Sequence, residues 1–288
     1  MGWKRISIVG LTELILLRSA ETEIHDSPSK YCYMRNFILQ AIRPAKTLLL
    51  LSLFVSCQKD KIIGPNPDLT PYRISKIKLI PSLEQSLDSI IYTFTYNRFG
   101  EPLTVRNTAV RTGNPNVVFK YDKLGRLLYM VRPYENQSYE SLDKYYYNEH
   151  NQIALDSQYN FGTYIDSVPT ATMGRGFYVR RFKYDALNRV TERTDSFFLG
   201  GGRSYGNTRT FQYDQAGNLI TGAAYDHKLN YRRTNVVWMF LTNDYSVNNA
   251  FIADTYSQFG LPLAWDTEDL LGTVVQGPGR VIISYESE

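Results

Sequence analysis

The stretch VFKYDKLGRLL, residues 118–128, decides the fold of this chain. Tyr121 is followed directly by Asp122 and, three residues later, by Gly125. An Asp at the first position of a type I turn can accept a hydrogen bond from the backbone two residues on. Gly adopts the left-handed conformation that closes such a turn through a bulge at little steric cost. The stretch therefore predicts a β-hairpin.

Five further stretches repeat this pattern. They are TFTYNRFGEPL (93–103), YYYNEHNQIA (145–154), RFKYDALNRVT (181–191), TFQYDQAGNLI (210–220) and ADTYSQFGLPL (253–263). The predicted turn-closing residues are Gly100, Gly125, Asn151, Asn188, Gly217 and Gly260. The residue two before the Tyr is aromatic in five of the six stretches, and the residue between them is polar in five of six. This period of two is typical of strands with one buried face and one wet face.

Six hairpins predict an all-β domain of about twelve strands over residues 73–288. Hairpins of this size cannot bury a core alone and must stack side by side. We expect an antiparallel meander whose twist curls it into a barrel or half-barrel. An irregular segment, 223–250, interrupts the repeats.

The first part of the chain has the layout of a secretory signal over residues 34–56. Met34 is followed by basic residues, by the apolar run TLLLLSLFV (47–55) and by Cys57. A run of nine residues is about half of what spans a bilayer as a helix. A buried helix is the alternative, which the polar residues directly after Cys57 disfavour. We expect residues 1–33 to be an upstream extension from a misplaced start, or else an unusually long leading part of the signal.

Phe54-Val55-Ser56-Cys57 resembles the lipobox of bacterial lipoproteins. The resemblance implies that the Cys57 thiol carries diacylglycerol and begins the mature chain, with membrane lipid as its partner. Two or three acyl chains hold a protein firmly, because each buried methylene contributes about 0.8 kcal/mol. Residues 57–72, rich in Pro and Gly, are expected to form a flexible tether.

Charge and cysteine content exclude several functions. The chain has 32 basic and 28 acidic residues, a net charge of +4, but residues 1–56 hold seven of the former and four of the latter, so the net falls to +1 without them. That balance does not suggest nucleic-acid binding. Cys32 and Cys57 are the only cysteines. No disulfide within the mature chain, metal site or cofactor is predicted.

The motif Tyr-Asp-x-x-Gly-Arg, present at Tyr121–Arg126 and with Asn for Gly at Tyr184–Arg189, resembles the YD repeat of the Rhs family. Together with the lipobox, it resembles small bacterial lipoproteins of unknown function with a porin-like β-domain. The resemblance implies an architecture and not an activity. The Asp-Pro-x-Gly-Leu core motif of the large Rhs shells is absent, so their toxin-enclosing role is not carried over.

Two places are candidates for ligand binding. The segment 223–250 resembles such lipoproteins at Tyr225–Asn230 and Ser246–Asn249, and Tyr146 must lie on the wet face if its two Tyr neighbours do not. The candidate ligand-binding residues are Tyr146, Asp226, Lys228, Asn230, Trp238, Asn248 and Asn249. The favoured alternative makes the segment a plug whose polar groups bond to one another and whose apolar residues fill the concave face of the sheet.

No catalytic motif supports an enzyme. His150 and His227 occupy turn-like positions, and no phosphate-binding loop occurs. A Gly-x-Ser-x-Gly match is present at Gly202–Gly206, but it is expected in a connector between strands and lacks the strand-turn-helix context of a catalytic serine. We therefore predict a lipid-anchored envelope protein, placed at the outer membrane with the leaflet left open. It would act as a binding or structural module for a glycan, peptide or envelope protein. The alternative is an envelope hydrolase using His227 with Asp226.

Overall fold

The computed structural model describes residues 71–82, 88–172, 176–199 and 202–287. The chain divides into two compact units, Met1–Cys57 and Gln58–Glu288, and all described residues belong to the second. The predicted extension, the signal, Cys57 and the tether up to residue 70 lie outside the described residues.

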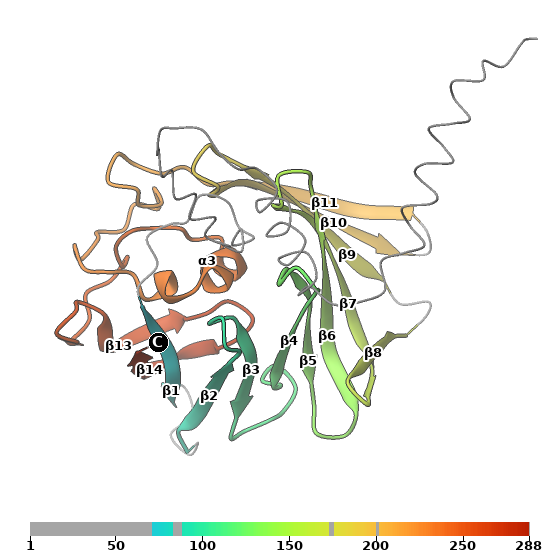
Figure 1. Cartoon of the computed structure of the whole chain (residues 1–288), viewed down its shortest axis with the longest axis horizontal. Helices are drawn as coiled ribbons and strands as arrows, with labels where there is room; N and C mark the ends of the chain where they lie inside the picture. The colour runs from blue at the N-terminus through green and yellow to red at the C-terminus, as the bar shows by residue number, and fades with distance from the viewer. Residues whose placement is uncertain (1–70, 83–87, 173–175, 200–201, 288) are drawn as a thin grey trace, which may run out of the picture. The chain divides into compact units, whose positions relative to one another are not determined.

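Fourteen antiparallel strands form one sheet (Figure 1). They are β1 (Tyr72–Pro81), β2 (Ile90–Tyr96), β3 (Pro102–Asn107), β4 (Val117–Tyr121), β5 (Leu127–Pro133), β6 (Ser138–Tyr147), β7 (Ile153–Ile165), β8 (Val168–Ala171), β9 (Phe177–Tyr184), β10 (Val190–Leu199), β11 (Gly202–Thr210), β12 (Thr255–Tyr256), β13 (Pro262–Asp269) and β14 (Gln276–Ser287). Two short helices, η1 (Tyr231–Thr234) and α3 (Val236–Thr242), lie between β11 and β12 in the sequence.

The sheet is a meander whose two ends are not joined. Its order is β11-β10-β9-β7-β6-β5-β4-β3-β2-β1-β14-β13-β12, with β8 paired to β7 alone. The first strand lies between β2 and β14, so the two ends of the described chain meet inside the sheet. Among the described residues, β11 and β12 are the two edges. The predicted all-β antiparallel meander is confirmed, in the open, half-barrel form.

The strand count differs from the expected twelve for local reasons. β1, β8 and β14 lie outside the six repeats, as does β11 except for Thr210. The fifth repeat keeps its turn, but its flanks pair only through an isolated bridge between Tyr213 and Leu219. The sixth hairpin has a first strand of just two residues, β12.

The six repeat turns share one backbone geometry. The Gly125 N–H donates to the Asp122 carbonyl at 3.0 Å, and Asp122 Oδ1 accepts from the backbone N–H groups of Leu124 and Arg126. The closing residue has a positive φ in every repeat, from 57° at Asn151 to 82° at Gly100. Only Gly and Asn occupy this region at low cost, which explains their recurrence.

In the second to fifth repeats, the repeat tyrosine links its turn to the turn before it. The hydroxyl of Tyr121 donates to the Pro102 carbonyl at 3.0 Å, and that of Tyr147 donates to the Leu127 carbonyl at 3.0 Å. Tyr184 and Tyr213 repeat the contact with Ile153 and Val190. In each case the acceptor lies two residues beyond the preceding turn. The tyrosine is therefore a cross-hairpin tie as well as a packing group.

The Asp and Arg of the motif complete this tie. Arg126 Nε forms an ion pair with Asp122 Oδ2 at 2.8 Å, and its guanidinium carbon lies 4.8 Å from the centre of the Tyr147 ring. Arg189 pairs with Asp185 in the same way and lies 4.1 Å from the Tyr213 ring. The motif thus fixes its own turn and covers the tyrosine of the next repeat.

The core lies between the concave face of the sheet and α3. The repeat aromatics Phe94, Phe119, Tyr145 and Phe182 are all buried. Phe94 and Phe119 contact Trp238 edge to face, while Tyr145 and Phe182 contact Phe240. The buried residues of this cluster that the structure describes run from Ile74 to Ile283, so the second unit contains a continuous core of its own.

Candidate ligand-binding site

The segment 223–250 lies on the concave face and connects the two edge strands. Asn235 caps the start of α3 by accepting from the Val237 N–H, and Asn243, at φ 52°, ends the helix. Trp238 has no exposed surface and lies against Phe94 and Phe119 at centroid distances of 5.7 and 5.8 Å. Its ring belongs to the core and presents no surface to a ligand.

Asp226 and Asn249 form the centre of a hydrogen-bond network inside this segment. Asp226 Oδ2 accepts from Asn249 Nδ2 at 2.9 Å and from the Tyr256 hydroxyl at 2.8 Å. Its Oδ1 accepts from the backbone N–H groups of Lys228 and Asn249. These partners do not include His227, the group with which the hydrolase alternative would pair Asp226.

Asn230 and Asn248 are tied down in the same way. Asn230 is fully buried, caps η1 through the Arg232 N–H and donates to the Ser246 carbonyl. Asn248 exchanges hydrogen bonds with Asn218 and donates to the Lys228 carbonyl. The polar groups of the segment bond to one another, as the plug alternative describes.

Lys228 and Tyr146 are at the surface of the protein but lie on different parts of it. Lys228 is exposed, with its Nζ 5.9 Å from the centre of the Tyr256 ring. Tyr146 is 50% exposed and, as the neighbour of buried Tyr145 on β6, points to the convex face. The seven predicted residues are therefore not gathered into a single surface.

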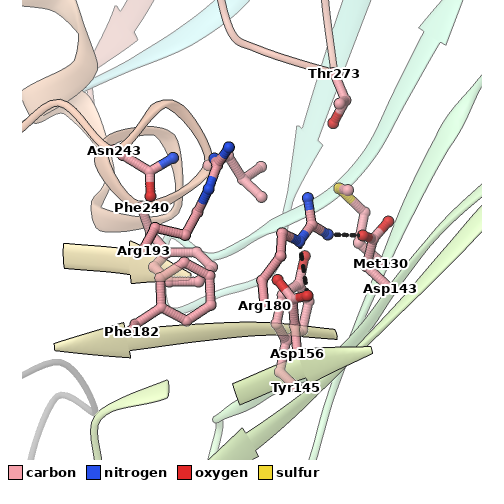
Figure 2. A pocket seen from close by; sticks show the side chains of 11 residues that line it. Met130, Asp143, Tyr145, Asp156, Arg180, Phe182, Arg193, Phe240, Asn243 and Thr273 are labelled. Carbon is pink, nitrogen blue, oxygen red and sulfur yellow. Dashed lines mark hydrogen bonds and ion pairs between the residues drawn. The ribbon is translucent and has the colours of Figure 1, made fainter. Parts of the chain in front are cut away.

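A pocket opens instead beside the plug, on the concave face of β5, β6, β7, β9 and β10. Its enclosed space is small, about 30 Å³, and it opens to solvent. The lining residues are Met130, Asp143, Tyr145, Asp156, Arg180, Phe182 and Arg193 from the sheet, and Phe240, Leu241, Asn243 and Thr273 from the covering segments. We call this the concave pocket. Figure 2 shows Arg180 between the carboxylates of Asp143 and Asp156, with Arg193 near Asn243.

The charges of the pocket are held by the strands in a fixed arrangement. Arg180 Nε donates to Asp156 Oδ1 at 2.7 Å, and Arg180 Nη2 donates to Asp143 Oδ1. Asp143 has a side chain only 1% exposed. Gln158 on β7 faces Asp143 on β6, and its side chain favours the charged form of the Asp143 carboxyl. None of the described residues is within hydrogen-bond distance and angle of Asp143 Oδ2. A buried acceptor of this kind is costly unless a further donor reaches it.

Burial governs the protonation of these groups. It raises the pKa of Asp143, against the opposing effect of Arg180. It also raises the pKa of Asp156 to about 7, with Arg180 lowering and Asp143 raising it. For Arg180, burial favours the neutral form, but the two carboxylates outweigh it and raise the pKa. The cluster therefore keeps a permanent cation beside two carboxyls that bind protons more readily than usual.

An aromatic patch continues the concave face from the pocket. Tyr178 and Phe197 have ring centroids 4.8 Å apart, and Tyr205 lies 5.5 Å from Phe197 and donates its hydroxyl to that of Tyr178. Tyr178 is two residues from Arg180 on β9, about 7 Å along the strand and on the same face. Tyr205 is 52% exposed, so the plug does not cover this end of the sheet.

The pocket and the patch together form a surface suited to a polar ligand with an apolar face. The partly exposed guanidinium groups of Arg180 and Arg193 can pair with hydroxyls or amides, and the rings can stack on a flat apolar surface. Sequence reasoning missed these residues, although a signal was present. Asp143 and Arg180 each stand two residues before a repeat aromatic, Tyr145 and Phe182, and so had to share the buried face.

Two features are absent from the described part of the chain. Within it, no helix is both long and apolar enough to cross a membrane. The same residues contain no group of three or more His, Cys, Asp or Glu side chains placed to hold a metal ion.

Comparisons with known proteins were made on the whole chain. No protein-family model matches it, and no curated protein matches it. Among solved structures, one match is a porin-like protein from Bacteroides uniformis, 11% identical with a TM-score of 0.34. The alignment covers 76% of this chain and 99% of that one.

Proposed function

We propose that this chain is a lipid-anchored cell-envelope protein that binds a glycan on the open part of its concave face. The observation that carries the proposal is the aromatic patch beside the concave pocket, with Tyr205 exposed and Arg180 held at the edge of the patch. Sugars present apolar ring faces and rows of hydroxyls, which match stacked aromatics beside carboxylate and guanidinium groups. Binding without turnover is the activity proposed.

A glycan array probed with the unit Gln58–Glu288 tests the binding. We expect retention on a restricted set of glycans that is lost in Tyr205→Ala and kept in Tyr146→Ala, whose side chain is equally exposed on the convex face. Retention unaffected by Tyr205→Ala would place any binding elsewhere. Hydrolysis of a retained glycan, abolished by His227→Ala, would favour the hydrolase alternative.

A peptide is the second candidate ligand, favoured by one observation. β11, nine residues long, forms an edge of the sheet, and an extended peptide can add to such an edge through backbone hydrogen bonds. A peptide array distinguishes the two ligands. A Pro at a β11 position whose N–H faces outward should weaken a peptide but not a glycan.

The anchor is supported by the layout of residues 34–57 alone. Growth of cells with a labelled fatty acid should give labelled protein from the wild type and none from Cys57→Ala. Equal labelling of the two would contradict acylation at Cys57.

A further inference from the structure

Four of the six repeat turns carry an exposed apolar side chain at the same position. The residue before the turn-closing Gly or Asn is Phe99, Leu124, Leu187 or Phe259, and these side chains are between 43% and 62% exposed. In the other two repeats it is His150 or Ala216. Single exposed apolar residues are ordinary, but a row at one repeat position calls for an explanation. We call these four residues the turn rim.

The pairing of the strands brings all four residues to one end of the sheet. β2, β4, β6 and β9 run toward their repeat turns, and their antiparallel partners return from them. The turn before β13 lies at the same end, because β13 is antiparallel to β14 and β14 is antiparallel to β1. The connections from β5 to β6 and from β7 to β8 lie at the opposite end.

The described chain also enters the sheet at the turn rim. β1 is antiparallel to β2, so Tyr72 lies at the end where β2 reaches its turn. The Tyr72 ring stacks on Phe259 with centroids 4.5 Å apart, and the Ile74 carbonyl accepts from the Tyr96 hydroxyl at 2.7 Å. Fourteen residues separate Cys57 from Tyr72 and span at most about 50 Å. Any anchor that precedes Tyr72 is joined to the domain at this rim.

From this placement we infer that the turn rim rests on the lipid bilayer, with Phe99, Leu124, Leu187 and Phe259 in the headgroup region. The inference rests on the proposed lipid anchor and adds the orientation of the anchored domain. Apolar side chains in that region leave water while the turn backbone stays near polar headgroups. The exposed charged residues at the repeat turns are of both signs: Arg98 and Lys123 are positive, and Glu149 and Asp214 are negative. Apolar contact, and not charge, is therefore the attraction.

This orientation turns the proposed glycan site away from the membrane. Along β9, Tyr184 adjoins the turn, Phe182 contacts α3, Arg180 lines the concave pocket and Tyr178 forms the aromatic patch. Each step along this series lies further from the rim. The plug therefore lies toward the bilayer end of the half-barrel, and the site opens toward the aqueous side.

The test replaces the acyl anchor with an artificial tether. The unit Gln58–Glu288 has its own core and no cysteine, so one introduced cysteine can carry a polarity-sensitive fluorophore. A hexahistidine tag before residue 58 holds this unit on phosphatidylethanolamine and phosphatidylglycerol vesicles that contain a nickel-chelating lipid. Leu124→Cys places the fluorophore on the rim. Val168→Cys is the matched control, because Val168 is 60% exposed, Leu124 is 61% exposed, and Val168 lies at the opposite end.

We expect the label at position 124 to shift to the blue on tethering and to be quenched several-fold more by brominated lipid than the label at position 168. Adding Phe99→Asp and Leu187→Asp should abolish the difference while leaving the melting temperature within a few degrees. Equal responses at both positions would overturn the inference. So would a blue shift without vesicles, which would identify a second copy of the chain as the occupant. Because the tether does not use Cys57, failure here is distinct from failure of fatty-acid labelling.

Discussion

The two parts of the concave face are built from strands of the same repeat but differ in what covers them. Over β2, β4 and β6, the repeat aromatics are sealed by Trp238 and Phe240. Over the far ends of β9 and β10, the equivalent face carries Tyr178 and Phe197, and Tyr205 beside them on β11 is 52% exposed. The repeat specifies the strands and turns but not every side chain on the concave face. These side chains form the core in one part and a solvent-facing surface in the other.

The largest expected effect breaks the sealed part. Trp238→Ala should lower the free energy of unfolding by about 3–5 kcal/mol, because it leaves a cavity between α3 and the sheet. Urea unfolding of the wild type and the variant measures it. Tyr146→Ala, on the convex face, is the control and should change stability by less than about 0.5 kcal/mol. Similar losses in both variants would mean that α3 does not seal the core.

The turns should be equally important in both parts. Gly125→Val and Asn188→Val each force a β-branched residue into the left-handed region, at φ 76° and 58°, and should each cost about 1–3 kcal/mol. Thermal melts of the two variants test this. An unchanged melting temperature in one of them would show that the repeat geometry is not needed in that part.

The pocket should give the open part a pH dependence that the sealed part lacks. The pKa of folded Asp156 is raised to about 7, whereas an unfolded Asp titrates near about 3.9. Between these values the folded protein binds more protons than the unfolded chain, so this group makes stability fall as the pH rises through that window. Above about pH 7 its effect is constant.

Asp156→Asn should remove this part of the pH dependence. Between pH 5 and 8, the wild type should lose on the order of 2 kcal/mol relative to the variant. Urea unfolding at several pH values measures the difference. Parallel curves for the two proteins would show that Asp156 does not titrate in this window.

The smallest effect on stability should come from the aromatic patch. Tyr205→Ala removes a half-exposed ring on an edge strand and should change the free energy of unfolding by less than about 0.5 kcal/mol. The same change should abolish glycan retention. A large loss of stability would instead make the patch a structural element.

The repeat predicted much of this fold because its turn chemistry is local. Asp122 and Gly125 specify their turn within four residues, and the alternation around Tyr145 assigns the buried face. The pairing of β1 with β14 brings Tyr72 beside Ser287. No short sequence pattern predicts it, because the two residues are far apart in the chain. The alternation also assigns the charged residues of the pocket to the buried face, but their partners lie on neighbouring strands. Asp143 and Arg180 meet only after folding, and periodicity cannot show that two such charges will pair.

A ligand bound at the proposed site must cover the concave face of the sheet and leave the convex face exposed. Phe197 and Phe198 are adjacent on β10, are both half-buried and point to opposite faces. Hydroxyl-radical footprinting with a glycan retained on the array measures both rings in one experiment. Protection of Phe197 and Tyr205 with no change at Phe198 is the predicted result. Protection of Phe198 alone, or of neither ring, would contradict a binding site on the concave face.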